Sequence, residues 1–454
     1  MQKALVWKIA LVAAVMLLLQ IPIEAIRGLV SERQQRRNGV IAEIARGTAE
    51  AQRIAGPVLY VPWTRRSVET TTTKDDVGRE RSVSRERVEH GQVAFLPETL
   101  SIEGSIELQE KHRSLYKAHL YTLHAVLRGR FTLPAGLGVP RVGGTLVFGQ
   151  ARLVFGIQDP RGIRDGVQLE WGGAPLALRP GGIEAAGLAS GIHAELGQPE
   201  AAASHDFRIL LPLVGTERLE IVPVGAVTSV SLSSKWPHPG FGGRILPEAG
   251  TRVSGHGFSA RWRTSHFANN LAQLHERCVR SRQCDAFNQH TLALSFVQPV
   301  DLYQTVERAV KYGILFIGLT FAAFFLFEVL QRRALHPVQY ALVGFALALF
   351  FLLLIALAEH LGFALAYAIA ASACVALNAY YVAHALQSAR RGAGFGIALT
   401  ALYGLLYVIL RAEDHALLMG SVLVFACLAL AMIATRGVDW YAFGASPQAG
   451  GKPA

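Results

Sequence analysis

The chain has 454 residues, of which 51% are hydrophobic and 17% are charged, and its formal net charge is +11 at pH 7. Because soluble chains carry about 25% charged residues, this composition excludes a protein that is water-soluble throughout. The basic residues form no tract interleaved with aromatic residues, and no zinc-finger, RNP or helix-turn-helix pattern occurs, so we predict no nucleic-acid partner. We interpret the positive charge as that of a basic protein surface lying near anionic lipid.

The first apolar segment, residues 4–23, is long enough to cross a bilayer, which takes about 20 apolar residues. Lys3 and Lys8 also resemble the basic start of a signal peptide. The sequence around Pro22, however, offers no cleavage site with small residues at the required positions. We therefore predict that residues 1–23 are an uncleaved transmembrane anchor.

Residues 24–307 have the composition of a globular domain and a pattern of short strands separated by Gly and Pro. Such runs of β-branched and aromatic residues, as at 58–63, are typical of a sandwich or an open barrel. One helix is expected, at residues 269–279. Two polar stretches, residues 70–87 and 181–204, are predicted to be exposed loops. The segment is therefore predicted to be one large, mainly-β domain.

Five further apolar segments lie within residues 308–436 and are joined by very short connections, so neighbouring helices are expected to be antiparallel. They are residues 312–330, 338–358, 361–384, 394–410 and 416–434. Together with the anchor they predict a six-helix transmembrane α bundle, with one helix before the β domain and five after it. Residues 437–454 are predicted to be a tail.

The orientation follows from Lys and Arg in short loops, because such loops stay on the cytoplasmic side of a membrane. These basic residues recur at every second connection: Lys3 and Lys8, Arg332 and Arg333, Arg390 and Arg391, and Arg436. The pattern predicts a multi-pass protein of a bacterial inner membrane. Both termini, including residues 437–454, would be cytoplasmic, and the domain of residues 24–307 would be periplasmic.

Two cysteines, Cys278 and Cys284, lie in the predicted periplasmic domain between His275 and His290. Cysteine and histidine are zinc ligands, but this spacing matches no familiar zinc finger. Because the periplasm oxidises neighbouring thiols, we predict a disulfide between Cys278 and Cys284, with free thiols and a metal site as the alternatives. No metal and no other cofactor is predicted for the chain.

A stiff, extended segment is expected where prolines restrict the backbone among aromatic residues: Trp236, Pro237, His238, Pro239 and Phe241. Such a segment can present its aromatic side chains to a partner. Alternatively, it forms a rigid corner whose aromatic rings pack into the domain, and this interpretation is favoured.

Two acid–histidine doublets lie at the predicted outer ends of membrane helices: Glu359 with His360, and Asp414 with His415. Acids and histidines within a membrane can bind metal or relay protons. Because both doublets lie at the boundary of the bilayer, the favoured interpretation is that they are polar loop residues.

Several strings of the sequence resemble one family. They are WPHP at 236–239, DLYQTVERAVKYG at 301–313, FFLFE at 324–328, LHPVQY at 335–340, EHLGFA at 359–364, YGLLYV at 403–408 and VDWY at 438–441. Together they resemble the CreD family of inner-membrane proteins, over most of the chain and most strongly from Trp236 onward. The resemblance implies a role in cell-envelope integrity, downstream of a two-component stress response, and it implies no catalytic residues.

No catalytic signature occurs in the sequence: it has no G-x-S-x-G, no H-E-x-x-H, no P-loop and no glycine-rich dinucleotide motif. We therefore predict that the chain is not an enzyme. We expect it to contribute to envelope integrity by binding an unidentified envelope protein or glycan through its periplasmic domain, with the lipid bilayer around its helices. A transport or scaffolding component is the alternative, and a periplasmic or intramembrane enzyme comes third.

Overall fold

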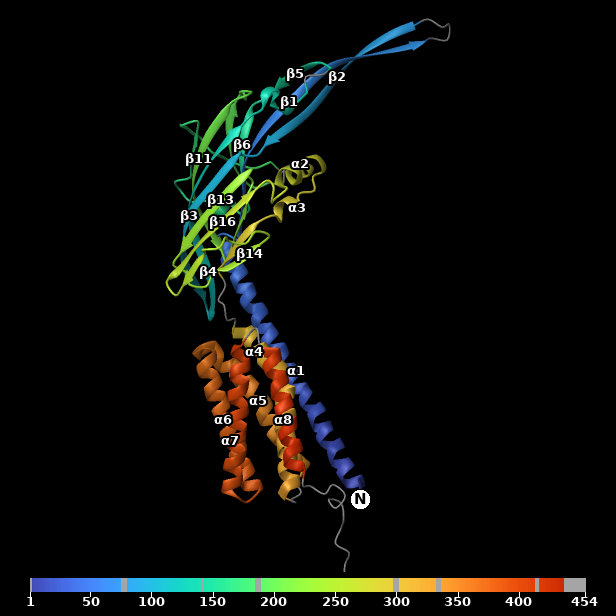
Figure 1. Cartoon of the computed structure of the whole chain (residues 1–454), viewed down its shortest axis with the longest axis vertical. Coiled ribbons are helices and arrows are strands. Elements are labelled where there is room, and N and C mark those ends of the chain that lie inside the picture. The colour runs from blue at the N-terminus through green and yellow to red at the C-terminus, as the bar shows by residue number, and fades with distance from the viewer. Residues whose placement is uncertain are drawn as a thin grey trace, which may run out of the picture. The chain divides into compact units, whose positions relative to one another are not determined.

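The computed structural model describes residues 2–74, 80–140, 143–183, 189–296, 302–331, 336–412 and 416–436 (Figure 1). The chain divides into two compact units. The helical unit comprises Met1–Asn38 and Val300–Ala454, and the β unit comprises Gly39–Pro299.

Six helices carry the apolar segments. They are α1 (Gln2–Gly47), α4 (Leu302–Gln331), α5 (Pro337–Leu361), α6 (Phe363–Ala385), α7 (Ala389–Arg411) and α8 (Ala416–Thr435). Among the described residues, five of these helices contain stretches long and apolar enough to cross a membrane, and α8 holds a shorter one, Leu418–Ile433. Large apolar side chains such as Ile397, Phe425 and Leu430 lie exposed, which suits contact with lipid. The predicted fold class, a membrane protein with a mainly-β domain after its first helix, is confirmed.

Helix α1 does not end at residue 23, where the predicted anchor ends, but continues to Gly47. The hydropathy falls after residue 23 because the sequence becomes rich in Arg, Glu and Gln. These residues are good helix formers, and pairs one turn apart support the helix, as between Glu32 and Arg36 at 3.2 Å. A boundary drawn from hydropathy therefore misses the polar half of this helix.

Close packing in the helical unit depends on a glycine of α5. A Cβ atom at Gly344 would collide with the side chain of Leu19 on α1 and with the ring of Phe321 on α4. A small residue at a helix interface lets backbones approach closely, which drives helix association where lipid provides no hydrophobic contrast. Gly344 thus allows α1 and α4 to pack against α5.

The β unit contains a nine-stranded sheet in the order β14-β17-β12-β1-β6-β10-β9, with β2 and β5 also paired to β1. Its strands are β1 (Gln52–Lys74), β2 (Glu80–Phe95), β5 (Thr145–Phe148), β6 (Ala151–Ile157), β9 (Arg179–Pro180), β10 (Gly191–Gly197), β12 (Arg218–Val222), β14 (Gly240–Gly243) and β17 (Leu292–Ser295). Strand β1 is parallel to β12, and the other pairs in this sheet are antiparallel.

The second sheet has eight strands in the order β15-β16-β13-β3-β4-β11-β7-β8. They are β3 (Thr99–Arg113), β4 (Tyr116–Thr132), β7 (Gln168–Trp171), β8 (Ala174–Leu176), β11 (Ser204–Thr216), β13 (Val227–Ser234), β15 (Arg252–Ser254) and β16 (Gly257–Ser265). The short helices of the unit are η1 (Ala135–Gly138), η2 (Pro160–Gly162), α2 (Leu271–Ser281) and α3 (Asp285–Asn288). Helix α2 lies where a helix is expected from the sequence.

A single hydrophobic cluster contains residues from both sheets. Successive side chains of a strand point to opposite faces, so every second residue can be buried. In β4, for example, Leu123, Ala125 and Leu127 are buried, and so is Val154 of β6 in the other sheet. The β unit is therefore built from two sheets that share one core.

The polar stretch of residues 70–87, predicted to be an exposed loop, largely forms a hairpin of β1 and β2 (Figure 1). Cross-strand pairs explain how so polar a sequence can be a sheet. The hydroxyls of Thr70 and Ser84 lie 3.2 Å apart, and Arg87 of β2 lies 4.0 Å from Glu69 of β1. The other predicted loop, residues 181–204, contains strand β10.

Candidate functional site

A groove of about 1,320 Å³ lies in the β unit between strand β2 and helix α2. Residues 90–97 form a continuous part of its lining, and Trp63 and Arg65 of β1 contribute to it. The opposite lining comes from α2, with Leu271, Ala272 and Val279 among the residues that contribute. The walls are therefore a strand with its following turn and a helix, and much of their surface is apolar.

The ring of Trp63 lies against the backbone of Gly91, its cross-strand neighbour, where a Cβ atom would collide with the indole. The Arg65 guanidinium lies 5.2 Å from the centre of the same ring, which is a cation–π contact. Arg65 also donates a hydrogen bond of 2.7 Å to the carbonyl of Pro140, which helps to hold it there. The groove thus contains a fixed aromatic surface.

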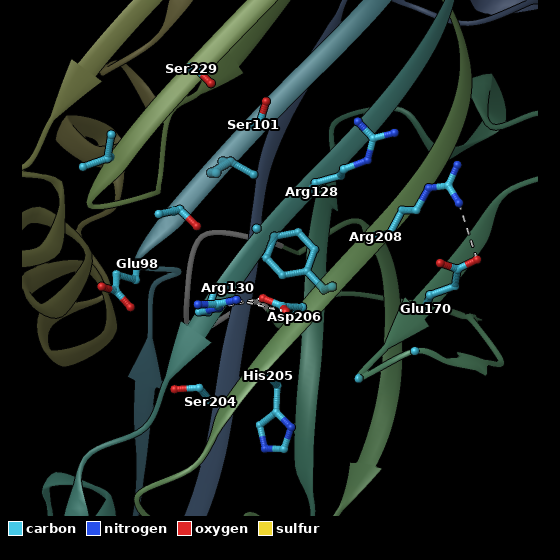
Figure 2. Close-up of a pocket in the computed structure, with 17 residues that line it drawn as sticks. Glu98, Ser101, Arg128, Arg130, Glu170, Ser204, His205, Asp206, Arg208 and Ser229 are labelled. Atoms are coloured by element: carbon cyan, nitrogen blue, oxygen red, sulfur yellow. Dashed lines mark hydrogen bonds and ion pairs between the residues drawn. The ribbon is translucent and has the colours of Figure 1, made fainter.

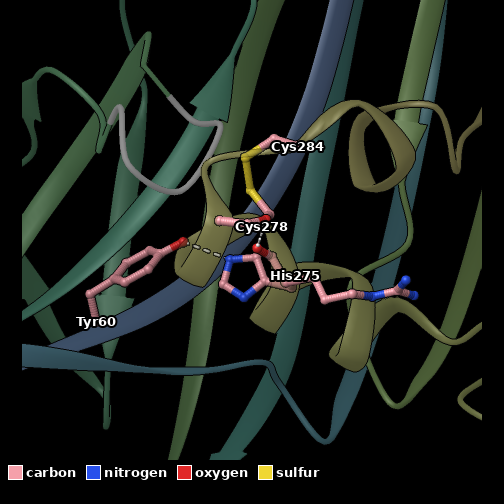
Figure 3. The surroundings of a disulfide bond; sticks show 6 residues. Tyr60, His275, Cys278 and Cys284 are labelled. Atoms are coloured by element: carbon pink, nitrogen blue, oxygen red, sulfur yellow. Dashed lines mark hydrogen bonds between the residues drawn. A yellow bond between two sulfur atoms is a disulfide. The ribbon is translucent and has the colours of Figure 1, made fainter.

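Helix α2 is amphipathic and buries Leu271, His275 and Cys278, which share one face at helical spacing. A disulfide joins Cys278 to Cys284 just beyond the helix, and the two Cα atoms lie 4.4 Å apart (Figure 3). The disulfide ties the helix to the segment that leads into α3, so the helical wall of the groove is braced at its C-terminal end.

Beneath this helix, the Tyr60 hydroxyl and His275 Nε2 form a buried hydrogen bond of 2.7 Å (Figure 3). Burial lowers the pKa of His275 to about 4 and raises the pKa of Tyr60. Both groups are therefore neutral near pH 7 and satisfy each other. The ring of Phe287 packs edge-on against His275, with 5.0 Å between centroids. Such a pair suits a structural contact better than acid–base chemistry.

The grouping of His275, Cys278, Cys284 and His290 does not assemble into a metal site. The two sulfur atoms are bonded to each other, and His275 is bonded to Tyr60. Within the described ranges, the structure brings together no cluster of three or more His, Cys, Asp and Glu side chains that could hold a metal ion.

A second depression, of about 930 Å³, lies on the eight-stranded sheet and is lined by charged side chains (Figure 2). Its arginines face acids: Arg130 donates to Asp206 at 2.7 and 3.1 Å, and Arg208 lies 3.8 Å from Glu170. The hydrogen bond from Arg130 holds the pKa of Asp206 below its usual value. These charges compensate one another, so this surface is less suited than the groove to bind a partner.

The stiff segment around Trp236 packs against the hydrophobic core. The Trp236 indole N–H donates a 2.8 Å hydrogen bond to the carbonyl of His238, and its ring lies 4.8 Å from that of His119. The ring of Phe241, on β14, packs edge-on against buried Phe258 and Trp262. Pro237 and Pro239 hold this turn between β13 and β14. The geometry is that of a rigid corner.

The boundary doublet of Glu359 and His360 lies at the C-terminal end of α5. Glu359 accepts a hydrogen bond of 3.1 Å from the Tyr303 hydroxyl and lies 3.6 Å from the Arg33 guanidinium, so it connects α5 to α4 and α1. His360 is exposed. The other doublet, Asp414 and His415, lies outside the described residues.

A family model and one relative of known family indicate the same family. The family model for "Inner membrane protein CreD" matches residues 4–441. The Inner membrane protein CreD of Escherichia coli K12 is 35% identical over 448 residues, which cover 98% of this chain and 95% of that protein. A solved structure from Legionella pneumophila, provisionally assigned as a nutrient-binding protein, covers 50% of this chain and 77% of its own at 12% identity, with a TM-score of 0.23. The chain belongs to the CreD family of inner-membrane proteins.

Proposed function

We propose that the chain contributes to cell-envelope integrity by binding an envelope partner through its β unit, without catalysing a reaction. The observation that carries this proposal is the groove between β2 and α2. At about 1,320 Å³ it is larger than the roughly 300–1,000 Å³ of most small-molecule sites, which favours a polymeric partner. His275 lines the groove, and its buried pair with Tyr60 is neutral and internally bonded, as expected for a binding surface.

We also propose that the β unit lies in the periplasm and that both termini are cytoplasmic. The alternation of Arg and Lys in the predicted loops supports this orientation. The disulfide between Cys278 and Cys284 supports it independently, because disulfides persist in the periplasm and are rare in the cytosol. An envelope partner would then meet the groove outside the inner membrane.

The function is tested by complementing a strain that lacks the chain and measuring its resistance to detergent. We expect each His, Asp, Glu or Ser of the β unit to tolerate replacement by Ala without loss of resistance, provided the protein level is unchanged. The function would instead be that of an enzyme if one such variant were present at the normal level yet inactive, and if the purified chain turned over an envelope substrate.

A further inference from the structure

Strand β2 has a free edge, since in the part of the chain that the structure describes it pairs with β1 alone. Pro62 shows which backbone groups face that edge, because its carbonyl accepts a hydrogen bond from Gly149 N–H on the other side of β1. In an antiparallel ladder the backbone N–H and C=O groups of two paired residues either point toward each other or both point away from each other. Gln92, opposite Pro62, therefore directs its N–H and C=O to the free edge, as do Val88 and Ala94.

The charge along this edge changes abruptly. Six of the ten residues from 80 to 89 are charged: Glu80, Arg81, Arg85, Glu86, Arg87 and Glu89. Residues 90–95 contain no Lys, Arg, Asp or Glu. Charged side chains on an edge strand prevent pairing with another chain. One half of β2 is thus protected against strand addition, and the other half is not.

The unprotected half coincides with the groove. Residues 90–97 line it, and Val93, Ala94 and Phe95 are partly buried against the core. Helix α2 lines the groove as well, with Leu271 and Ala272 among its contributions. The free backbone groups thus lie next to a channel whose lining is mostly apolar.

We propose that this half of β2 binds an extended segment of another envelope protein, which adds to the nine-stranded sheet as a further strand. The inference rests on the binding function proposed above and gives the partner's chemistry. A regular row of N–H and C=O groups is complemented by another polypeptide backbone, whose alternate side chains then contact the apolar lining. A glycan has no such backbone. Because α2 walls the groove, a single strand fits there better than the sheet edge of a second copy.

The test uses the full-length chain in detergent and a display library of random linear peptides of about ten residues, the length of a long strand. Enriched sequences are synthesised with a fluorescent label, and their Kd is measured by anisotropy. Gln92→Pro removes an amide donor from the free edge within the groove, while Gln92→Ala keeps that donor and removes only the side chain. Val88→Pro is the matched control, because it removes a donor from the same edge outside the groove.

We expect Gln92→Pro to weaken peptide binding about tenfold, and Gln92→Ala and Val88→Pro to change it less than about twofold. Ala272→Trp, at an exposed position of α2 that lines the groove, should weaken binding at least as much by filling the channel. It keeps the proposal testable if Gln92→Pro does not fold. Protease resistance and an intact disulfide establish folding for each variant.

Binding that survives both Gln92→Pro and Ala272→Trp overturns the proposal, as does a library that enriches no peptide. A wild-type dimer that Gln92→Pro converts to a monomer in light scattering also overturns it, since a second copy then occupies the edge. Detergent resistance of the complemented strain separates this inference from the wider function. If Gln92→Pro weakens peptide binding about tenfold but leaves detergent resistance intact, the groove is not the functional surface. The wider proposal, that the β unit binds an envelope partner, then stands through another surface.

Discussion

At the scale of single residues, the buried hydrogen bond between Tyr60 and His275 has a consequence for stability. Burial lowers the pKa of His275 from 6.5 to about 4. Between these two values, the unfolded chain binds a proton that the folded chain does not, so the free energy of unfolding falls as the pH is lowered. The stabilisation is complete above pH 6.5 and is lost as the pH falls through 4.

We therefore expect the free energy of unfolding to decrease by up to about 3 kcal/mol between pH 7 and pH 4 on account of His275 alone. His275→Gln removes the titrating group and keeps an acceptor for the Tyr60 hydroxyl, so its stability should depend less on pH. The measurement is the denaturant midpoint of both proteins at the two pH values. An equal change in both would show that His275 is not responsible.

The sequence predicts the components of this region but not their arrangement. The helix at 269–279, His275 and the two cysteines are recognisable from spacing alone. Tyr60 lies 215 residues before His275, and no local pattern links the two. The groove is formed by tertiary contacts between distant segments, so only its uncharged stretch, residues 90–95 within a charged region, is visible in the sequence.

At the scale of elements, the position of α2 depends on its disulfide. Cys278 and Cys284 close a small ring, so the chain-entropy contribution to stability is about 2 kcal/mol. Replacing both by Ser should lower the unfolding midpoint of the β unit and expose α2 to proteases. Replacing Cys374 and Cys427 of the helical unit by Ser is the control, because these two cysteines form no disulfide.

Thiol labelling of the unfolded chain checks the bond directly. Without reductant, two of the four cysteines, Cys374 and Cys427, should react, and with reductant all four should. Labelling of all four before reduction would be incompatible with the disulfide.

How well the sequence predicts each element depends on which interaction stabilises that element. The later apolar helices are predicted well, because a bilayer demands a long apolar stretch and the sequence shows it directly. Helix α1 is predicted only in its apolar half, since its polar half is held by pairs such as Glu32 with Arg36. The β1–β2 hairpin is missed because its stability comes from cross-strand pairs that do not produce alternating hydrophobicity.

At the scale of the whole molecule, the proposed orientation predicts where fused reporters work. Alkaline phosphatase is active only after export, because it needs disulfides that form in the periplasm. A fusion after Gly104, in β3, should be active, and a fusion after Arg391, at the start of α7, should be inactive. The reverse pattern would show that the β unit faces the cytoplasm.

The pairing of β12 determines when, during synthesis of the chain, the nine-stranded sheet can be completed. This strand pairs with β1, near the start of the unit, and with β17, at its end. A chain whose synthesis has not reached Ser295 therefore lacks the strand that pairs with both β12 and β14. Long-range pairing of this kind is slow, and unfinished strand edges are prone to aggregate. The β12 edge of a nascent chain thus remains unpaired until nearly the last residues of the β unit have been added, and an unpaired edge of this kind invites aggregation.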